Sequence, residues 1–304
     1  NKMKLNSNIK TAIRVAKIEL NSMFYSPVAW LVLVIFGFQI GMSFAQIYGE
    51  QLRYQDMGYD LWSVTSGVYT GMRGILPPIQ RYIYLYIPLI TMGLMSREYQ
   101  SGSIKLLYSS PVKNTSIIIG KFLSMMVYGG ALIAVLGVFV IFSAITIVNF
   151  DYPLVLSGML GLYLLILAYS AIGLFMSSIT KYQVVAAIGT LAVLAVLNFI
   201  GDVGQDYDLV RHITYWLSIT GRAYPFIDGL IASDNIFYFL IVIGFFLALS
   251  ILKLNTEKTI TPLKIKVLKY CVIVFVVLIL GYVSSTPYTK YYYDATYTKS
   301  NTLA

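Results

Sequence analysis

Charged residues are scarce in this 304-residue sequence: they make up 12% of it, against 58% hydrophobic residues. Soluble domains carry roughly 25% charged residues. This composition therefore excludes an ordinary soluble domain and predicts that a lipid bilayer surrounds most of the chain. No charged residue lies in the central part of any long apolar run. Because proton- and sodium-driven carriers usually need such groups, an ion-coupled carrier is the weaker alternative.

Cysteine and histidine occur once each, as Cys271 and His212. A single cysteine excludes an internal disulfide and a cysteine-rich metal site. The single Gly-Lys pair, Gly120 and Lys121, lacks the upstream glycine of a phosphate-binding loop, and no nucleophile has a histidine partner. We therefore expect no enzyme, cofactor or metal site in this chain. Nucleic-acid binding is not expected either, because no basic stripe with interleaved aromatic residues remains outside the apolar runs.

Apolar runs long enough to cross a bilayer recur along the chain. A helix rises about 1.5 Å per residue, so roughly 20 apolar residues cover a hydrocarbon core of about 30 Å. The second run is shorter, so we expect either that its helix begins before Arg81 or that the bilayer is thinner there. We also expect a kink at Pro88. The predicted spans are residues 28–48, 82–95, 122–148, 154–179, 184–200, 236–252 and 267–283.

The distribution of charge predicts an orientation. Residues 1–26, 97–121, 181 and 253–269 hold 15 of the 22 basic and 3 of the 13 acidic residues, so the remaining segments are acidic overall. Because basic residues collect on the cytoplasmic side of a membrane, we expect a cytoplasmic N-terminus and an external C-terminus.

Two segments outside the spans have a predicted structure of their own. Residues 1–26 combine an apolar stripe at helical spacing with a basic face. This pattern predicts an amphipathic helix that lies in the cytoplasmic headgroup layer or packs on another domain. The acidic residues 201–235 are expected to form an external helical hairpin that dips into the edge of the bilayer.

Residues 97–121, REYQSGSIKLLYSSPVKNTSIIIGK, form a polar and basic interruption between two apolar runs. We call them the docking segment. Their positive charge predicts a cytoplasmic location, and we expect a helix from Glu98 to Tyr108. This segment is where a separate cytosolic partner is expected to bind.

Residues 87–123 resemble the hallmark of ABC type-2 exporter permeases, particularly the branch associated with bacterial gliding motility. Ser103 stands where that branch usually has threonine, and Lys105 where a glutamate is common. The resemblance extends over residues 9–252. The positions that carry it are Pro88, Thr91, Met92, Glu98, Gly102, Leu106, Leu107, Pro111, Gly120 and Lys121.

The resemblance implies an all-α membrane protein: a six-helix permease bundle over residues 27–252 with the amphipathic interfacial helix before it. Residues 253–285 then form a cytoplasmic linker and a seventh transmembrane helix. The resemblance also implies a permease dimer of identical or related chains, bound to two cytosolic ATPase subunits that hold ATP and Mg. The residues expected to couple to the ATPase are Arg97, Glu98, Gly102, Ser103, Lys105, Leu106, Leu107 and Pro111. A translocation path is expected along Tyr84, Tyr86, Pro88, Met92 and Met95.

Residues 286–304 resemble the opening strand of the extracytoplasmic auxiliary protein that accompanies these permeases, through Tyr293, Asp294, Thr296, Thr302 and Leu303. A frayed tail is the alternative. The expected function is ATP-driven export or work on an envelope partner from the bacterial cytoplasmic membrane. A membrane anchor that holds an external domain without transport is the alternative from another class.

Overall fold

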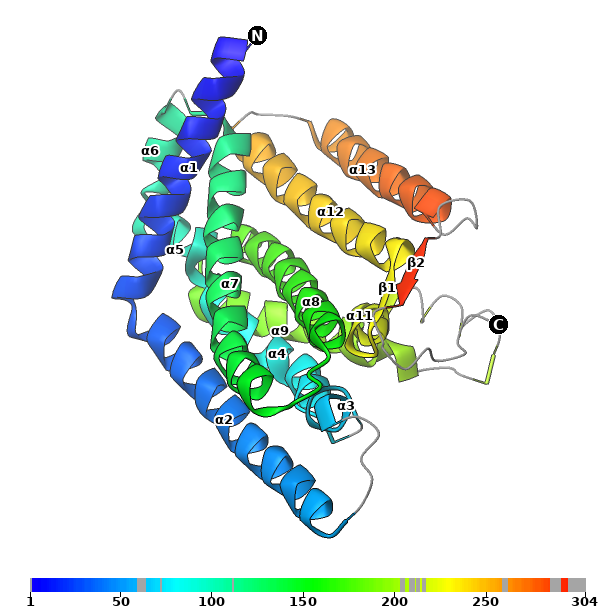
Figure 1. Ribbon diagram of the computed structural model, residues 1–304. Helices are drawn as coiled ribbons and strands as arrows, with labels where there is room; N and C mark the ends of the chain where they lie inside the picture. Colours follow the sequence, from blue (N-terminus) through cyan, green and yellow to red (C-terminus); the bar gives the residue numbers. More distant parts are fainter. Residues whose placement is uncertain are drawn as a thin grey trace.

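The computed structural model describes residues 2–58, 64–71, 73–110, 112–202, 206–207, 211, 214, 217–258, 262–284 and 291–294. It is an all-α protein with one two-stranded sheet among these residues (Figure 1). The helices of the first half are α1 (Lys2–Tyr25), α2 (Pro27–Asp56), α3 (Val64–Tyr69), α4 (Leu76–Thr91), α5 (Gly93–Ser101), α6 (Ile104–Ser109) and α7 (Asn114–Thr146). The second half contains α8 (Tyr152–Ile179), α9 (Gln183–Phe199), η1 (Ile200–Asp202), α11 (Ile219–Ile227), β1 (Leu230–Ala232), α12 (Ser233–Lys258), α13 (Leu263–Ser284) and β2 (Tyr292–Asp294).

Within the described residues, four helices are long and apolar enough to cross a membrane: α2, α7, α8 and α12. α9 is a shorter apolar helix, and α13 covers the predicted seventh span. The helix of the second span begins at Leu76, which confirms that it starts before Arg81. It is interrupted at Met92, four residues after Pro88, and continues as α5. α2 continues eight residues past the predicted span at residues 28–48 and ends at Asp56, and these last turns are polar.

α8 is the central helix of the bundle. In its most apolar stretch 67% of residues are buried, against 28–33% in α2, α7 and α12. It packs against α4, α7, α9, α11 and α12. Small residues permit close approach between membrane helices, and buried Ser157, Gly158 and Gly161 give α8 such a surface. Asp151 caps the start of α8 by accepting a hydrogen bond from the Leu154 backbone N–H at 3.2 Å.

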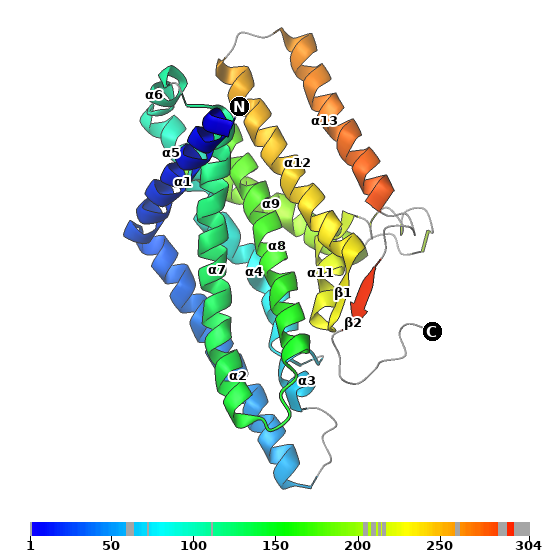
Figure 2. The same cartoon turned by 45° about the horizontal axis from the view of Figure 1, so that its top comes forward.

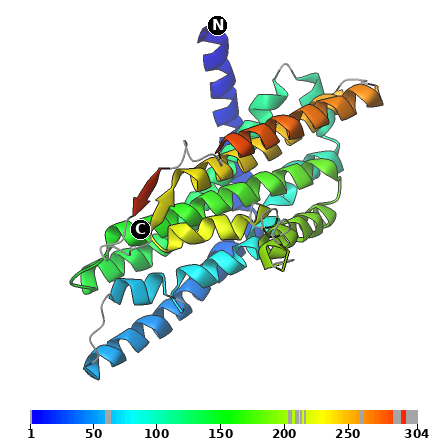
Figure 3. The same cartoon turned by 90° about the vertical axis from the view of Figure 1, so that its right-hand side faces the viewer.

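α1 runs across the direction shared by the long helices (Figure 3), the arrangement expected of an interfacial helix. Ala12 and Met23 are buried against the bundle, whereas Ile9 and Ile13 are 51% and 56% exposed. The predicted apolar stripe is therefore divided: part of it packs on the protein, and part remains free for lipid.

The predicted hairpin at residues 201–235 contains α11, which packs on α8 and α4. Gln80 of α4 donates a hydrogen bond to the Thr220 carbonyl of α11 at 2.7 Å. His212 lies outside the described residues.

β1 and β2 form the two-stranded sheet. They pair antiparallel, with Leu230 opposite Asp294 and Ala232 opposite Tyr292. A strand thus forms at Tyr293 and Asp294, where the resemblance predicts one, and its partner is β1. Whether an auxiliary domain begins here stays a prediction; Thr296, Thr302 and Leu303 lie outside the described residues.

Candidate functional site

The docking segment does not form the single helix expected from Glu98 to Tyr108. α5 ends at Ser101, and Gly102 follows with φ +74°. Glycine adopts this left-handed conformation without the steric cost that a Cβ adds, which is why it commonly ends helices. α6 then runs from Ile104 in a new direction. Gly102 is therefore a turn that sets α6 apart from α5.

A cluster of four charges fixes one side of this segment; Lys121 and Glu19 are buried, Glu98 is partly buried, and Arg97 is 42% exposed. The Lys121 ammonium is 1% exposed and lies 2.7 Å from Oε2 of Glu19 and 2.8 Å from Oε1 of Glu98. Arg97 Nη2 lies 2.7 Å from the other oxygen of Glu19. Two cations and two carboxylates therefore neutralise each other where α1, α5 and α7 meet. Buried charges require such pairing, because desolvation of an unpaired ion is very costly.

Glu19 is the member of this cluster whose role sequence reasoning missed. It is the sole acidic residue of residues 1–26 and is 6% exposed. A lone acid within a basic amphipathic helix was the available signal, because a buried carboxylate needs a cationic partner. Arg97 and Glu98, which are expected to couple to the ATPase, place their charged groups in this cluster, and 42% of the Arg97 side chain stays exposed.

A third carboxylate, Glu257 at the end of α12, binds the other side of the docking segment. Its Oε2 accepts hydrogen bonds from the Tyr99 hydroxyl at 2.5 Å and the Tyr108 hydroxyl at 2.8 Å, and its Oε1 pairs with Lys253 at 2.9 Å. Glu257 lies beyond the apolar span at residues 236–252. Burial opposes its charge, but the three hydrogen bonds and the Lys253 charge together lower the pKa of Glu257. The carboxylate is therefore ionised at neutral pH and acts as an acceptor for both tyrosines.

The surface that remains free on the docking segment is centred on α6. Leu106 is 73% exposed, and its neighbour Lys105 is also exposed. Ser103 is half-buried and bonds to Ser101 at 2.8 Å, whereas Leu107 packs against the core. Pro111 lies outside the described residues. The other exposed residues of this surface are Gln100, Ser101, Ser109 and Lys113.

The five residues predicted to line a translocation path do not share one surface. Pro88 and Met95 are buried. The Tyr86 hydroxyl donates to Gln39 of α2. The Tyr84 ring packs edge-on against Phe199 of α9 at 6.0 Å. Met92 is half-buried at the interruption between α4 and α5.

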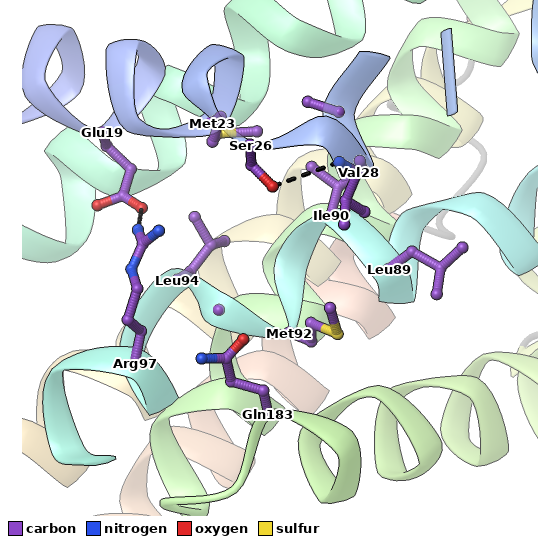
Figure 4. A pocket seen from close by; sticks show the side chains of 12 residues that line it. Glu19, Met23, Ser26, Val28, Leu89, Ile90, Met92, Leu94, Arg97 and Gln183 are labelled. Atoms are coloured by element: carbon purple, nitrogen blue, oxygen red, sulfur yellow. Dashed lines mark hydrogen bonds and ion pairs between the residues drawn. The ribbon is translucent and has the colours of Figure 1, made fainter. Parts of the chain in front are cut away.

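Met92 lines a pocket of about 120 Å³ at the junction of α1, α2, α4, α5 and α9. Figure 4 shows Arg97 and Glu19 on one side of it and Gln183 below, with apolar side chains along the wall. The four-charge cluster that reaches its edge is neutral, so the pocket presents no net charge from that side.

Ser177 of α8 holds the interruption at Met92. Its hydroxyl accepts from the backbone N–H groups of Met95 and Ser96 at 2.9 and 3.0 Å and donates to the Met92 carbonyl at 2.9 Å. The first N–H groups of a helix have no partner within that helix. Ser177 therefore caps the start of α5 from a neighbouring helix and fixes the base of the second span.

The substitution Ser177→Ala is expected to destabilise this junction by about 1–3 kcal/mol, because it leaves the buried Met95 backbone N–H without its acceptor. The matched control is Ser178→Ala, since the buried Ser178 hydroxyl bonds to Phe175 within its own helix. Melting of the detergent-solubilised protein checks this prediction. Equal melting temperatures for the two variants would contradict it.

Several apolar helices of membrane-spanning length define a multi-pass membrane protein. The described residues contain no group of three histidine, cysteine, aspartate or glutamate side chains that could hold a metal ion. A family model described as "ABC-2 family transporter protein" matches residues 13–205. The chain therefore belongs to this family and is a transmembrane permease subunit of an ABC transporter. No curated protein matches the chain.

The match begins within α1 and ends at residue 205, three residues after η1. It includes the docking segment and the Glu19, Arg97, Glu98 and Lys121 cluster. α11, α12, α13 and both strands lie beyond it, and so does Glu257.

Proposed function

We infer that the docking segment binds a cytosolic ATPase subunit, which holds ATP and Mg, and that nucleotide-driven movement of that subunit drives this chain. The observation that carries the proposal is an exposed Leu106 on a short helix whose flanks are held by buried or partly buried carboxylates. A few side chains near the centre of a protein interface carry most of its binding energy, and Leu106 has this central position on the exposed surface.

The same arrangement explains how a push on α6 would reach the membrane. Tyr108 within α6 is bonded to Glu257 of α12. Glu98 and Arg97 connect the preceding helix to α1 and α7. A rigid element transmits displacement when its contacts have little freedom to rearrange. In this proposal Lys105 and Leu106 contact the ATPase. Arg97 and Glu98 act as positioning residues, and Gly102 and Ser103 form the turn before α6. Leu107 and Pro111 support the contact surface.

The working assembly in this proposal is two permease chains with two ATPase subunits in the bacterial cytoplasmic membrane. The charge distribution supports a cytoplasmic N-terminus and an external C-terminus. β2 lies beside the hairpin at residues 201–235, which agrees with an external C-terminus. Tyr84, Tyr86, Pro88, Met92 and Met95 are proposed to respond to movement of the second span beside the cargo path. Export or envelope work of the gliding-motility kind remains a proposal that rests on resemblance.

The substitution Leu106→Asp is expected to reduce ATPase binding by about 2 kcal/mol or more, the cost of losing an interface anchor. That cost corresponds to roughly 30-fold weaker binding. Co-purification of the ATPase with the permease in mild detergent measures it. Ser109→Asp is the matched control, because it places the same charge on the edge of the exposed surface.

Ser109→Asp should retain most of the binding. Unchanged binding for Leu106→Asp would remove the docking role. The rival anchor function predicts that deleting residues 97–113 leaves activity intact. An ion-coupled carrier predicts activity that collapses with an uncoupler while ATP is held constant.

A further inference from the structure

α12 reaches from the docking segment at one end to the strand pair at the other. Figure 2 shows it running from the level of α5 and α6 down to β1 and β2. It contains 26 residues and no proline, so its length is roughly 39 Å at 1.5 Å per residue. Sharp kinks in helices arise mainly at prolines or at disturbed hydrogen bonding. An uninterrupted helix of this kind moves as one body.

At the docking end, α12 is held by side chains from three parts of the segment. Tyr99 and Tyr108 donate to one oxygen of Glu257. In addition, the Asn114 amide donates to Asn255 Oδ1 at 2.7 Å. A displacement of α6 therefore acts directly on the last turn of α12.

At the opposite end, no loop separates α12 from the strand pair. Ala232 ends β1, and Ser233 begins α12. The Ser233 N–H donates to the Tyr291 carbonyl, and the Tyr291 N–H donates to the Ser233 hydroxyl, both at 2.9 Å. The first residue of α12 is thus bonded to the segment that follows α13.

The second span offers a less direct route. Its helix is interrupted at Met92 between the docking segment and the bundle. α12 crosses the same distance without a break.

We propose that α12 is a mechanical link that carries movement of the docking segment to the strand pair β1–β2, with Glu257 as the positioning residue at its docking end. The proposal rests on the proposed function, because the ATPase supplies the movement. The segment after α13 then responds to the nucleotide state on the far side of the membrane. Both Glu257 and the strand pair lie outside the region that the family model matches.

The test measures how readily the two strands form a disulfide. Ile231 and Tyr293 are opposite each other in the register, and such residues lie about 4.5–5.5 Å apart between Cα atoms, within the range of a disulfide. Cysteines replace both residues in a Cys271→Ser background. The complex is isolated through a tag on the ATPase, so every sample contains a bound ATPase. The rate of disulfide formation is compared with and without a non-hydrolysable ATP analogue.

The expected result is a nucleotide-dependent change in that rate of roughly fivefold or more, the lower end of coupling between distant sites. Glu257→Ala should abolish the change. Lys253→Ala is the matched control, because it removes the ion pair of Glu257 within α12 and leaves both tyrosine hydrogen bonds to Glu257. This variant should retain the nucleotide-dependent rate of disulfide formation.

Full nucleotide dependence in Glu257→Ala would overturn the link, and so would loss of the dependence in both variants. An unresponsive strand pair in the parent complex would overturn the link and leave ATPase docking intact. Failure to isolate any complex through the tag would instead overturn the proposed function.

Discussion

Replacing Lys121 with methionine is expected to destabilise the protein by about 3–5 kcal/mol, the usual cost of breaking a buried ion pair by removing one partner. The change leaves Glu98 without its cation and Glu19 with Arg97 alone. Both carboxylates then lose charge compensation at the junction of α1, α5 and α7. At roughly 2–4 °C per kcal/mol, the melting temperature in detergent should fall by about 6 °C or more.

Two comparisons make this prediction specific. Lys113→Met removes an exposed lysine eight residues earlier in the docking segment and should change the melting temperature little. Lys121→Met combined with Glu19→Gln and Glu98→Gln should recover part of the loss, because neutral groups tolerate burial better than unpaired charges. A melting temperature for Lys121→Met equal to that of Lys113→Met would show that the cluster does not hold the junction.

The substitution Gly120→Ala is expected to force α1 away from α7. An added Cβ would lie 2.7 Å from the Ala12 carbonyl oxygen and 2.7 Å from Val15 Cβ. The backbone oxygen cannot rotate aside, so the helices must separate, at a cost of about 1–3 kcal/mol for overpacking. Limited trypsin digestion at Lys10 and Lys17 measures the release of α1, and cleavage should become faster.

Gly130→Ala is the matched control on the same helix, because no atom lies within 4 Å of its added Cβ. Alanine favours a helix by about 0.8–1.0 kcal/mol over glycine, so this variant should keep α1 protected and melt at the same or a higher temperature. Equal cleavage rates for the two variants would contradict a close α1–α7 contact at Gly120.

The Gly-Lys pair thus has a physical explanation that the sequence did not supply. Gly120 allows α1 to approach, and Lys121 binds the carboxylate that α1 brings. The sequence excluded a phosphate-binding role for this pair and aligned it with a family motif. It could not identify Glu19 as the partner, because the two residues are 102 positions apart.

The expected helix from Glu98 to Tyr108 is the clearest error of local prediction. Its polar composition suits a helix, but Gly102 takes the left-handed conformation and ends α5. The sequence carried this signal, since a glycine inside a helical pattern marks a possible end. The new direction of α6 matters for function because it exposes Leu106 while Tyr108 reaches Glu257.

The sequence by itself determined the class of protein, most of the spans and an expected sidedness. Apolar runs and basic flanks are local properties, and the bilayer acts on each of them separately. Only the tertiary structure decided which carboxylates hold the docking segment and which helix connects it to the strand pair. Those contacts join side chains up to 158 positions apart in the sequence, and such residues become neighbours only when the helices pack around α8.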